Sequence, residues 1–165
     1  MKQKKYKVGM YGGKFMPFHK GHLHCVEEAA KLCDTLYVIL FHGGAQELQI
    51  LKDRPNEKFL TFEDRIKHTK EGCKHVKNAI VTDIDVTECK NPDGTENWDM
   101  ETHLVLEKCG HLDAVFSSET GDVDYYNRAY PDAECILIDV ERNEVPISAT
   151  MIRAMNEEER KKWII

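Results

Sequence analysis

The chain has 165 residues, of which 41% are hydrophobic and 32% charged, and its formal net charge at pH 7 is −6. This length predicts one domain, residues 1–165, whose core needs no disulfide and no structural metal. The acidic balance argues against a nucleic-acid carrier, because phosphate backbones attract clustered lysine and arginine. No apolar run approaches the roughly 18 to 20 residues of a membrane span, and no secretory signal follows the basic start. We therefore expect a cytoplasmic protein with neither membrane nor nucleic-acid partners.

Five short segments have the apolar character of β-strands. One of them, TLYVILF, is apolar along almost its whole length, as expected when both faces of a parallel sheet are covered. The predicted strands are residues 5–11, 35–41, 78–84, 113–118 and 134–140.

Helical segments separate these strands. Thr61 begins one of them as a predicted N-cap, with the acid Asp64 three residues later in a pattern similar to a capping box. Other helices are predicted after Gly21, over residues 98–108, and from Ser148 to the end.

The six cysteines are scattered along the chain without a C-x-x-C pair. In a chain of this kind we interpret them as reduced thiols rather than as disulfides. They are Cys25, Cys33, Cys73, Cys89, Cys109 and Cys135.

The alternation of strands and helices predicts an α/β fold with right-handed crossovers, a Rossmann-like doubly wound parallel sheet of about five strands. In such sheets ligands bind at the carboxyl ends of the strands, near the point where the strand order reverses. Three predicted loops fall on that edge: residues 12–22, 42–60 and 117–122. The second is long enough to act as a mobile lid.

The first of these loops lies within GGKFMPFHKGHLH, residues 12–24. Gly12 and Gly13 let the backbone turn sharply and let a ligand approach, and Gly21 does the same where the helix opens. The first N–H groups of a helix lack an intrahelical partner and carry a partial positive charge. We therefore expect an anion site at this helix start.

Three side chains of the same segment suit an anion. His19 and His22 are three residues apart and are predicted to face it together, and Lys14 adds a movable cation. The spacing matches neither the P-loop nor the dinucleotide-binding fingerprint. Two other interpretations stay open: a zinc site formed by His22, His24 and Cys25, and histidines that have no chemical role.

A second polar segment, PISATMIR, occupies residues 146–153. Ser148 is a predicted N-cap of a short helix whose first N–H groups face anions, and Thr150 offers a hydroxyl group there. Arg153 follows one turn later with a planar guanidinium that suits phosphate oxygens. Alone, this pattern is also typical of an ordinary capped helix.

Together, H-x-G-H at residues 19–22 and ISATMIR at residues 147–153 resemble the two-motif signature of the nucleotidyltransferase superfamily related to class I aminoacyl-tRNA synthetases. Nearly the whole chain is similar to the nicotinamide mononucleotide adenylyltransferase domain of NadR-like proteins. The stretches that carry this similarity are GKFMPFHKGH (13–22), KDRPN and FEDR within residues 52–65, NWD (97–99), SSE (117–119) and PISATMIR (146–153).

The resemblance implies that His19, His22 and Lys14 bind the phosphates of ATP and stabilise charge at the α-phosphate, while Arg153 binds the β and γ phosphates. The acceptor's 5′-phosphate would attack the α-phosphorus in line and release pyrophosphate. Mg²⁺ would arrive bound to ATP, since the sequence offers no aspartate cluster that could hold the metal. The residues implied in ATP binding are Gly12, Gly13, Phe15, Gly21, Ser117, Ser118, Glu119, Ile147, Ser148 and Thr150.

The acceptor implied by the resemblance is nicotinamide mononucleotide, and the product is NAD. Trp98 and Asp99 would stack on the pyridinium ring and contact its charge or carboxamide. Arg54 and Arg65 would contact the acceptor phosphate or order the loop that carries them. Each of these four residues also has an ordinary structural interpretation, as an apolar anchor or a surface charge.

Other functions compete with this prediction. One is the same chemistry with another acceptor, either phosphopantetheine with ATP or a phospho-alcohol with CTP; the NWD and SSE segments favour nicotinamide. Another is a nucleotide sensor without turnover, although the full set of transition-state contacts argues against it. The motif reads ISA where the family has ISG, a difference that concerns the identity of the acceptor more than the type of reaction. The sequence is compatible with a homo-oligomer and does not define the oligomeric state.

Overall fold

The computed structural model describes residues 4–164, and these contain one five-stranded parallel sheet in the order β3-β2-β1-β4-β5. The predicted doubly wound α/β fold is therefore confirmed. The strands are β1 (Tyr6–Gly13), β2 (Cys33–His42), β3 (Ala79–Asp85), β4 (Ala114–Ser117) and β5 (Glu134–Leu137).

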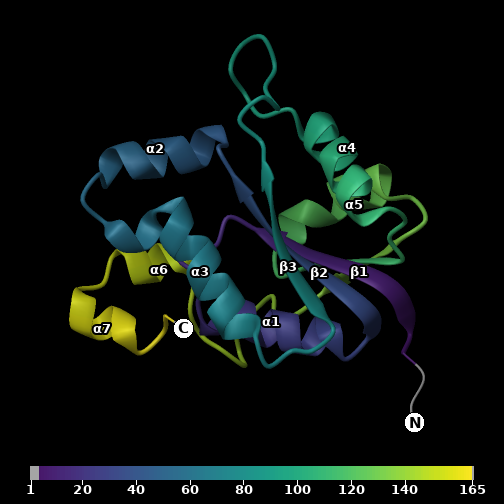
Figure 1. Ribbon diagram of the computed structural model, residues 1–165, viewed down its shortest axis with the longest axis horizontal. Helices are drawn as coiled ribbons and strands as arrows, with labels where there is room; N and C mark the ends of the chain where they lie inside the picture. Colours follow the sequence, from purple (N-terminus) through teal and green to yellow (C-terminus); the bar gives the residue numbers. More distant parts are fainter. Residues whose placement is uncertain (1–3, 165) are drawn as a thin grey trace.

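Helices cover both faces of this sheet (Figure 1). Side chains of α1 and α3 pack on one face, and side chains of α4 and α5 pack on the other. The helices are α1 (Lys20–Ala30), α2 (Ala45–Asp53), η1 (Lys58–Leu60), α3 (Phe62–Cys73), α4 (Trp98–Cys109), η2 (Thr120–Asp122), α5 (Val123–Ala129), α6 (Ala149–Arg153) and α7 (Glu157–Lys161). None of the helices in residues 4–164 is long and apolar enough to cross a membrane.

Side-chain caps begin the helices where the sequence predicts them. Thr61 Oγ1 accepts a hydrogen bond from the Asp64 N–H (3.3 Å) at the start of α3. Ser148 Oγ accepts one from the Met151 N–H (3.2 Å) at the start of α6. Each cap satisfies a backbone donor that the helix itself leaves unpaired.

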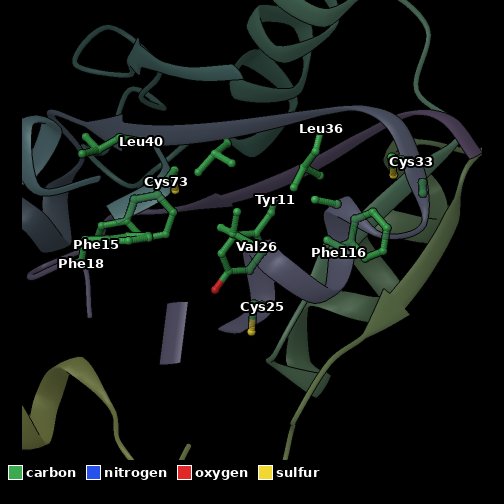
Figure 2. Packing of buried hydrophobic residues seen from close by; sticks show 14 of the residues in the cluster. Tyr11, Phe15, Phe18, Cys25, Val26, Cys33, Leu36, Leu40, Cys73 and Phe116 are labelled. Carbon is green, nitrogen blue, oxygen red and sulfur yellow. The ribbon is translucent and has the colours of Figure 1, made fainter. Parts of the chain in front are cut away.

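The core beneath α1 extends into the loop after β1. Phe15 and Phe18 are buried there beside Tyr11 and Val26, as Figure 2 shows. The rings of Phe15 and Phe18 meet edge to face with centroids 5.1 Å apart. Because aromatic side chains anchor this loop in the core, its polar residues are held against a rigid base.

The strand order reverses beside β1. After β1 the chain forms β2 and β3 on one side, and β4 and β5 then pair on the other. The loops that follow β1 and β4 therefore open on the same edge, at the switch point where doubly wound sheets bind ligands.

Two predictions are wrong, one about a connecting loop and one about the end of a strand. Residues 42–60, predicted as a loop, contain α2 and η1, and the one buried residue of α2 is the charged Glu47. The strand predicted over residues 134–140 ends at Leu137. Its partner β4 ends at Ser117, and Asp139 turns the chain away with a positive φ of 48°.

Gly9 in the middle of β1 is packed too closely for a side chain. A Cβ atom there would lie 2.6 Å from Cys33 Sγ and 2.8 Å from Phe116 Cε2. We expect Gly9→Ala to lower the free energy of unfolding by about 1–3 kcal/mol, measured by urea denaturation, because a tightly packed core must shift. Gly121→Ala is the control, since nothing lies within 4 Å of a Cβ atom at Gly121. Equal stability of the two variants would contradict this packing.

Candidate active site

A cavity of about 530 Å³ opens at the switch point. Its walls come from the segments after β1, β2 and β4, the start of α1, and parts of α2, α4, α5 and α6. Thirteen residues predicted for the site line it: Gly12, Gly13, Lys14, Phe15, His19, His22, Trp98, Ser117, Ser118, Glu119, Ser148, Thr150 and Arg153. Segments far apart in the sequence therefore meet in one cavity.

His19 and His22 form a reciprocal cap at the start of α1. The His19 Nδ1 atom accepts hydrogen bonds from the N–H groups of Gly21 (3.0 Å) and His22 (3.4 Å). In return, His22 Nδ1 accepts one from the His19 N–H (3.2 Å). The two rings stack with centroids 3.7 Å apart. This is the arrangement of a capping box with imidazoles in place of a hydroxyl and a carboxylate.

The cap changes what the helix start offers to a ligand. The Lys20 N–H donates to the Trp163 carbonyl oxygen (2.9 Å), and the next two N–H groups donate to His19. These first-turn N–H groups are therefore satisfied within the protein. The anion site expected on these helix N–H groups is therefore not formed, and binding of an anion by the side chains of this segment stays a prediction.

The cap also fixes the tautomer of both rings. A ring nitrogen that accepts a hydrogen bond carries no proton, so each neutral imidazole holds its hydrogen on Nε2. Burial lowers the pKa of His19 to about 3. Burial also lowers the pKa of His22 well below its usual value, with smaller effects from the charges of His19 and Arg142. Near neutral pH both rings are thus neutral Nε2–H donors.

The two donors are held by close packing. Phe18 stacks on the His22 ring with centroids 5.5 Å apart, and Phe15 meets the same ring edge-on at 4.8 Å. The Nε2 atom of His19 is buried and has no hydrogen-bond partner among residues 4–164. A buried donor without a partner is costly, so a ligand acceptor beside it would restore the missing hydrogen bond.

Gly21 has a different role from the predicted one. A Cβ atom at this position would lie 2.8 Å from His19 Cε1 and 3.0 Å from His19 Nδ1. The glycine therefore makes room for the capping ring, and Gly21 does not line the cavity.

Two of the predicted cations line the cavity from different segments of the chain. Lys14 Nζ donates to Gln46 Oε1 in α2 (2.9 Å). Arg153 in α6 donates from Nη1 to the Met16 carbonyl oxygen (2.9 Å) and from Nη2 to Thr150 Oγ1 (3.4 Å). These bonds hold the guanidinium of Arg153 against the loop that follows β1.

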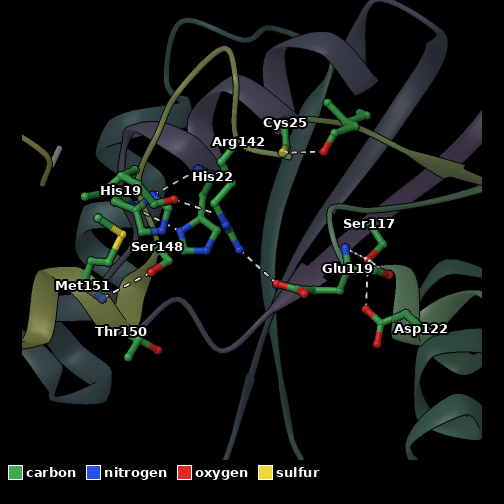
Figure 3. Close-up of polar contacts among 12 residues, drawn as sticks. His19, His22, Cys25, Ser117, Glu119, Asp122, Arg142, Ser148, Thr150 and Met151 are labelled. Atoms are coloured by element: carbon green, nitrogen blue, oxygen red, sulfur yellow. Dashed lines mark hydrogen bonds and ion pairs between the residues drawn. The ribbon is translucent and has the colours of Figure 1, made fainter. Parts of the chain in front are cut away.

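Sequence reasoning missed a third cation, Arg142. It donates from Nη1 to the Ile147 carbonyl oxygen (2.9 Å) and from Nη2 to Glu119 Oε1 (3.0 Å), as Figure 3 shows. Arg142 has a positive φ of 54° in an irregular segment, so no periodic pattern identifies it. Its position five residues before ISATMIR is the one signal in the sequence. Ile147, predicted for ATP binding, is fully buried and contributes its carbonyl oxygen to this bond.

The SSE segment forms a tight polar turn after β4. Ser117 Oγ donates to Asp122 Oδ2 (2.9 Å) and accepts a hydrogen bond from the Glu119 N–H (3.0 Å). Through Glu119 the turn is tied to Arg142, so the two segments that flank this end of the cavity are joined by an ion pair.

The end of the cavity near α4 is aromatic and acidic. Trp98 is 52% exposed, donates from Nε1 to Glu96 Oε2 (3.2 Å), and meets the Tyr125 ring at 5.2 Å. The Oε2 atom of Glu101 is buried without a partner among the described residues. Burial and the nearby charge of Glu96 raise the pKa of Glu101 to about 7, and the charge of Lys14 opposes this. Sequence reasoning missed both glutamates, which lie in a polar turn and on a helix.

Three residues predicted for the acceptor do not line the cavity. Asp99 is exposed on α4, and Arg54 pairs with Glu57 at 3.5 Å. Arg65 is fully buried with its Nη1 atom 2.8 Å from Glu47 Oε1. The full burial of Arg65 argues against direct contact with an acceptor, and its second predicted role, ordering of the loop, stays a prediction.

No group of three or more histidine, cysteine, aspartate or glutamate residues within the described part of the chain could hold a metal ion. The zinc alternative at His22, His24 and Cys25 is therefore not formed. The six cysteines are free thiols.

The family of the protein follows from this fold and site. A model of the cytidylyltransferase-like family matches residues 10–155, which include both sequence motifs. The chain belongs to this family of nucleotidyltransferases.

Known relatives include an NAD biosynthesis/regulator protein and a phosphopantetheine adenylyltransferase. The chain is 26% identical to the trifunctional NAD biosynthesis/regulator protein NadR of Escherichia coli over 154 residues, 88% of this chain and 36% of that protein. It is 29% identical to phosphopantetheine adenylyltransferase of Streptococcus equi subsp. zooepidemicus over 151 residues, 90% of this chain and 81% of that enzyme. The crystal structure of NadR protein in complex with NR matches with a TM-score of 0.68 at 22% identity, over 99% of this chain and 45% of that chain. The similarity to NadR proteins is confirmed, and the chain spans little more than a third of the Escherichia coli protein.

The raised pKa of Glu101 makes stability depend on pH. Its carboxyl group has a pKa of about 7 in the folded protein and 4.5 ordinarily, so ionisation favours the unfolded chain as the pH rises between these values. The stability that the protonated form provides is complete below pH 4.5 and lost above pH 7. We expect Glu101→Gln to raise the melting temperature at pH 8 and to change it little at pH 4.5, measured by scanning calorimetry. The exposed Glu107→Gln on the same helix is the control; the same shift at both pH values would contradict the prediction.

Proposed function

We propose that the protein transfers AMP from Mg-ATP to nicotinamide mononucleotide, forming NAD and pyrophosphate. The observation that carries this proposal is the charge asymmetry of the cavity. Neutral imidazole donors lie with Arg153 and with Arg142, which pairs with Glu119, in one part of the cavity. Trp98 lies with Glu96 and Glu101 in another part, where the charge of Lys14 also acts on Glu101. Nicotinamide mononucleotide matches both parts, because it combines a phosphate with a positively charged aromatic ring. Such a ring gains from an aromatic face and from ionised carboxylates.

The proposed step forms one bond and breaks one. An oxygen of the acceptor's 5′-phosphate attacks the α-phosphorus of ATP, and the bond from that phosphorus to the oxygen of the β-phosphate breaks, so pyrophosphate leaves with the bonding electrons. A phosphate monoester has a second pKa of about 6 and is mostly a dianion at neutral pH. The attacking oxygen of the acceptor therefore carries no proton, and no general base is needed. The protein contributes positioning and stabilisation of charge on the α-phosphoryl oxygens.

The cavity residues fit these tasks. The Nε2–H groups of His19 and His22 are preorganised donors for α-phosphoryl oxygens, and they remain neutral near pH 7. Lys14 and Arg153 are cations for the phosphates that leave. Mg²⁺ neutralises polyphosphate charge when bound, and we propose that phosphate oxygens and water hold it, with no cage of protein carboxylates.

The second candidate acceptor is phosphopantetheine, which the streptococcal relative favours. Its pantetheine arm is uncharged, so it gains no charge attraction from the carboxyl groups of Glu96 and Glu101. The acidic end of the cavity therefore supports the nicotinamide nucleotide over this alternative.

His22 provides the test of the phosphate end. We expect His22→Ala to lower turnover at least about a hundredfold, as found when one preorganised donor to a developing oxyanion is removed. The measurement is pyrophosphate release with circular dichroism as the check on folding. His24→Ala is the matched control, since His24 lies on the same helix and does not line the cavity. Turnover near that of the wild type in folded His22→Ala protein would rule out the role of this residue.

Acceptor choice tests the other end. We expect pyrophosphate release with nicotinamide mononucleotide, less with nicotinate mononucleotide because its ring carboxylate would face Glu96 and Glu101, and little with phosphopantetheine. Glu96→Gln together with Glu101→Gln should raise KM for nicotinamide mononucleotide about tenfold at pH 8, equivalent to about 1.4 kcal/mol of binding. Preferred use of phosphopantetheine would overturn the acceptor and keep the reaction. ATP binding without turnover of any acceptor would favour a nucleotide sensor.

A further inference from the structure

The described chain contains a buried ion pair at the wall of the cavity, which Glu47 helps to line and to which the proposed transfer step gives no role. Arg65 in α3 is 0% exposed and Glu47 in α2 is 4% exposed. Their Nη1 and Oε1 atoms lie 2.8 Å apart, at an angle that gives an ion pair without a directed hydrogen bond. Burying two charges is costly, and a well-packed apolar pair is often as stable, so stability alone is a weak reason for this contact.

Each partner also binds the backbone of a different loop. Arg65 Nη1 donates to the Lys14 carbonyl oxygen (2.9 Å) in the loop after β1. Glu47 Oε2 accepts a hydrogen bond from the Gly43 N–H (2.8 Å) in the loop after β2. The ion pair thus connects the ends of two neighbouring strands, and both loops form walls of the cavity.

Both loops have left-handed backbone at the points that the pair holds. Phe15, directly after Lys14, has a φ of 50°, and Gly43 has a φ of 91°. A bulky residue such as Phe15 rarely adopts this conformation, and it persists where surrounding contacts determine it. The hydrogen bond from Arg65 fixes the peptide group between Lys14 and Phe15, so it is one of those contacts.

The conformation of Phe15 matters for the site because its ring packs edge-on against His22 at 4.8 Å. The same loop carries the side chain of Lys14 to Gln46. A chain of direct contacts therefore runs from Arg65 through the Lys14 carbonyl group and the Phe15 ring to the His22 imidazole.

We propose that Arg65 and Glu47 are positioning residues, which hold the loops after β1 and β2 so that His22 and Lys14 face the nucleotide in a productive geometry. The proposal rests on nucleotide transfer in this cavity and is independent of the acceptor. Misplacement of a catalytic group by about 1 Å can cost a hundredfold in rate, so a positioning pair can be important even when neither residue takes part in the chemical step.

The test replaces both charges together. In Arg65→Met with Glu47→Met no unpaired charge is left buried, so we expect the variant to fold with a melting temperature close to that of the wild type. We expect kcat for pyrophosphate release to fall at least about tenfold. Lys31→Met with Glu28→Met, which removes an exposed ion pair outside the cavity, is the control and should keep wild-type kcat.

A double-mutant cycle separates positioning from a general structural effect. If the pair acts through His22, the same two substitutions made in the His22→Ala background should lower kcat by no more than about threefold. An equal loss in both backgrounds, or wild-type kcat in the folded pair variant, would overturn the proposal.

A readout independent of turnover keeps this test separate from the proposed function. The imidazole NMR signals of His22 should shift in the pair variant, because its aromatic neighbour Phe15 moves, and they should stay unchanged in the control. Arg65→Lys, whose shorter side chain carries a compact charge in place of the planar guanidinium, serves if the pair variant does not fold. Unchanged His22 signals in either folded variant would contradict the proposal even if no acceptor is turned over.

Discussion

The reciprocal cap between His19 and His22 is the interaction on which the site depends. It satisfies the backbone at the start of α1 with imidazole nitrogens, so one set of hydrogen bonds both begins the helix and orients the two rings. Gly21 leaves room for the His19 ring, and the aromatic side chains of Phe15 and Phe18 pack against His22. The site is therefore rigid because the same contacts build the fold and the site.

This arrangement explains why the phosphate end combines neutral donors with fixed cations. Two protonated histidines in contact would repel each other and the nearby Arg142, and burial disfavours their charge further. The positive charge comes from Arg153 and from Arg142, which are held by backbone carbonyl groups, and Arg142 also pairs with Glu119. The opposite end has carboxylates and an aromatic ring. A substrate with a phosphate at one end and a positive ring at the other fits this gradient of charge.

The sequence predicts the fold and most of the site, because strand periodicity, capping residues and the two motifs are local signals. The wrong and missing predictions have a common cause, because tertiary contacts determine these features and the local sequence does not show such contacts. The expected helix anion site is closed by a side-chain cap that H-x-G-H spacing does not reveal, and Arg65 is buried by Glu47, the one buried residue of α2. Arg142 and Glu101 reach the cavity from an irregular segment and a helix, where charged residues are ordinarily exposed.

The most direct measurement of the central claim is the protonation state of the two capping imidazoles. Long-range ¹H–¹⁵N NMR correlation at pH 7 distinguishes a protonated ring nitrogen from an unprotonated one, and assignment through single histidine substitutions identifies His19 and His22. The reciprocal cap predicts that both rings are neutral, with an unprotonated Nδ1 and a proton on Nε2. A positively charged ring, or a proton on Nδ1 of either residue, would contradict the cap and the role of these histidines as neutral donors.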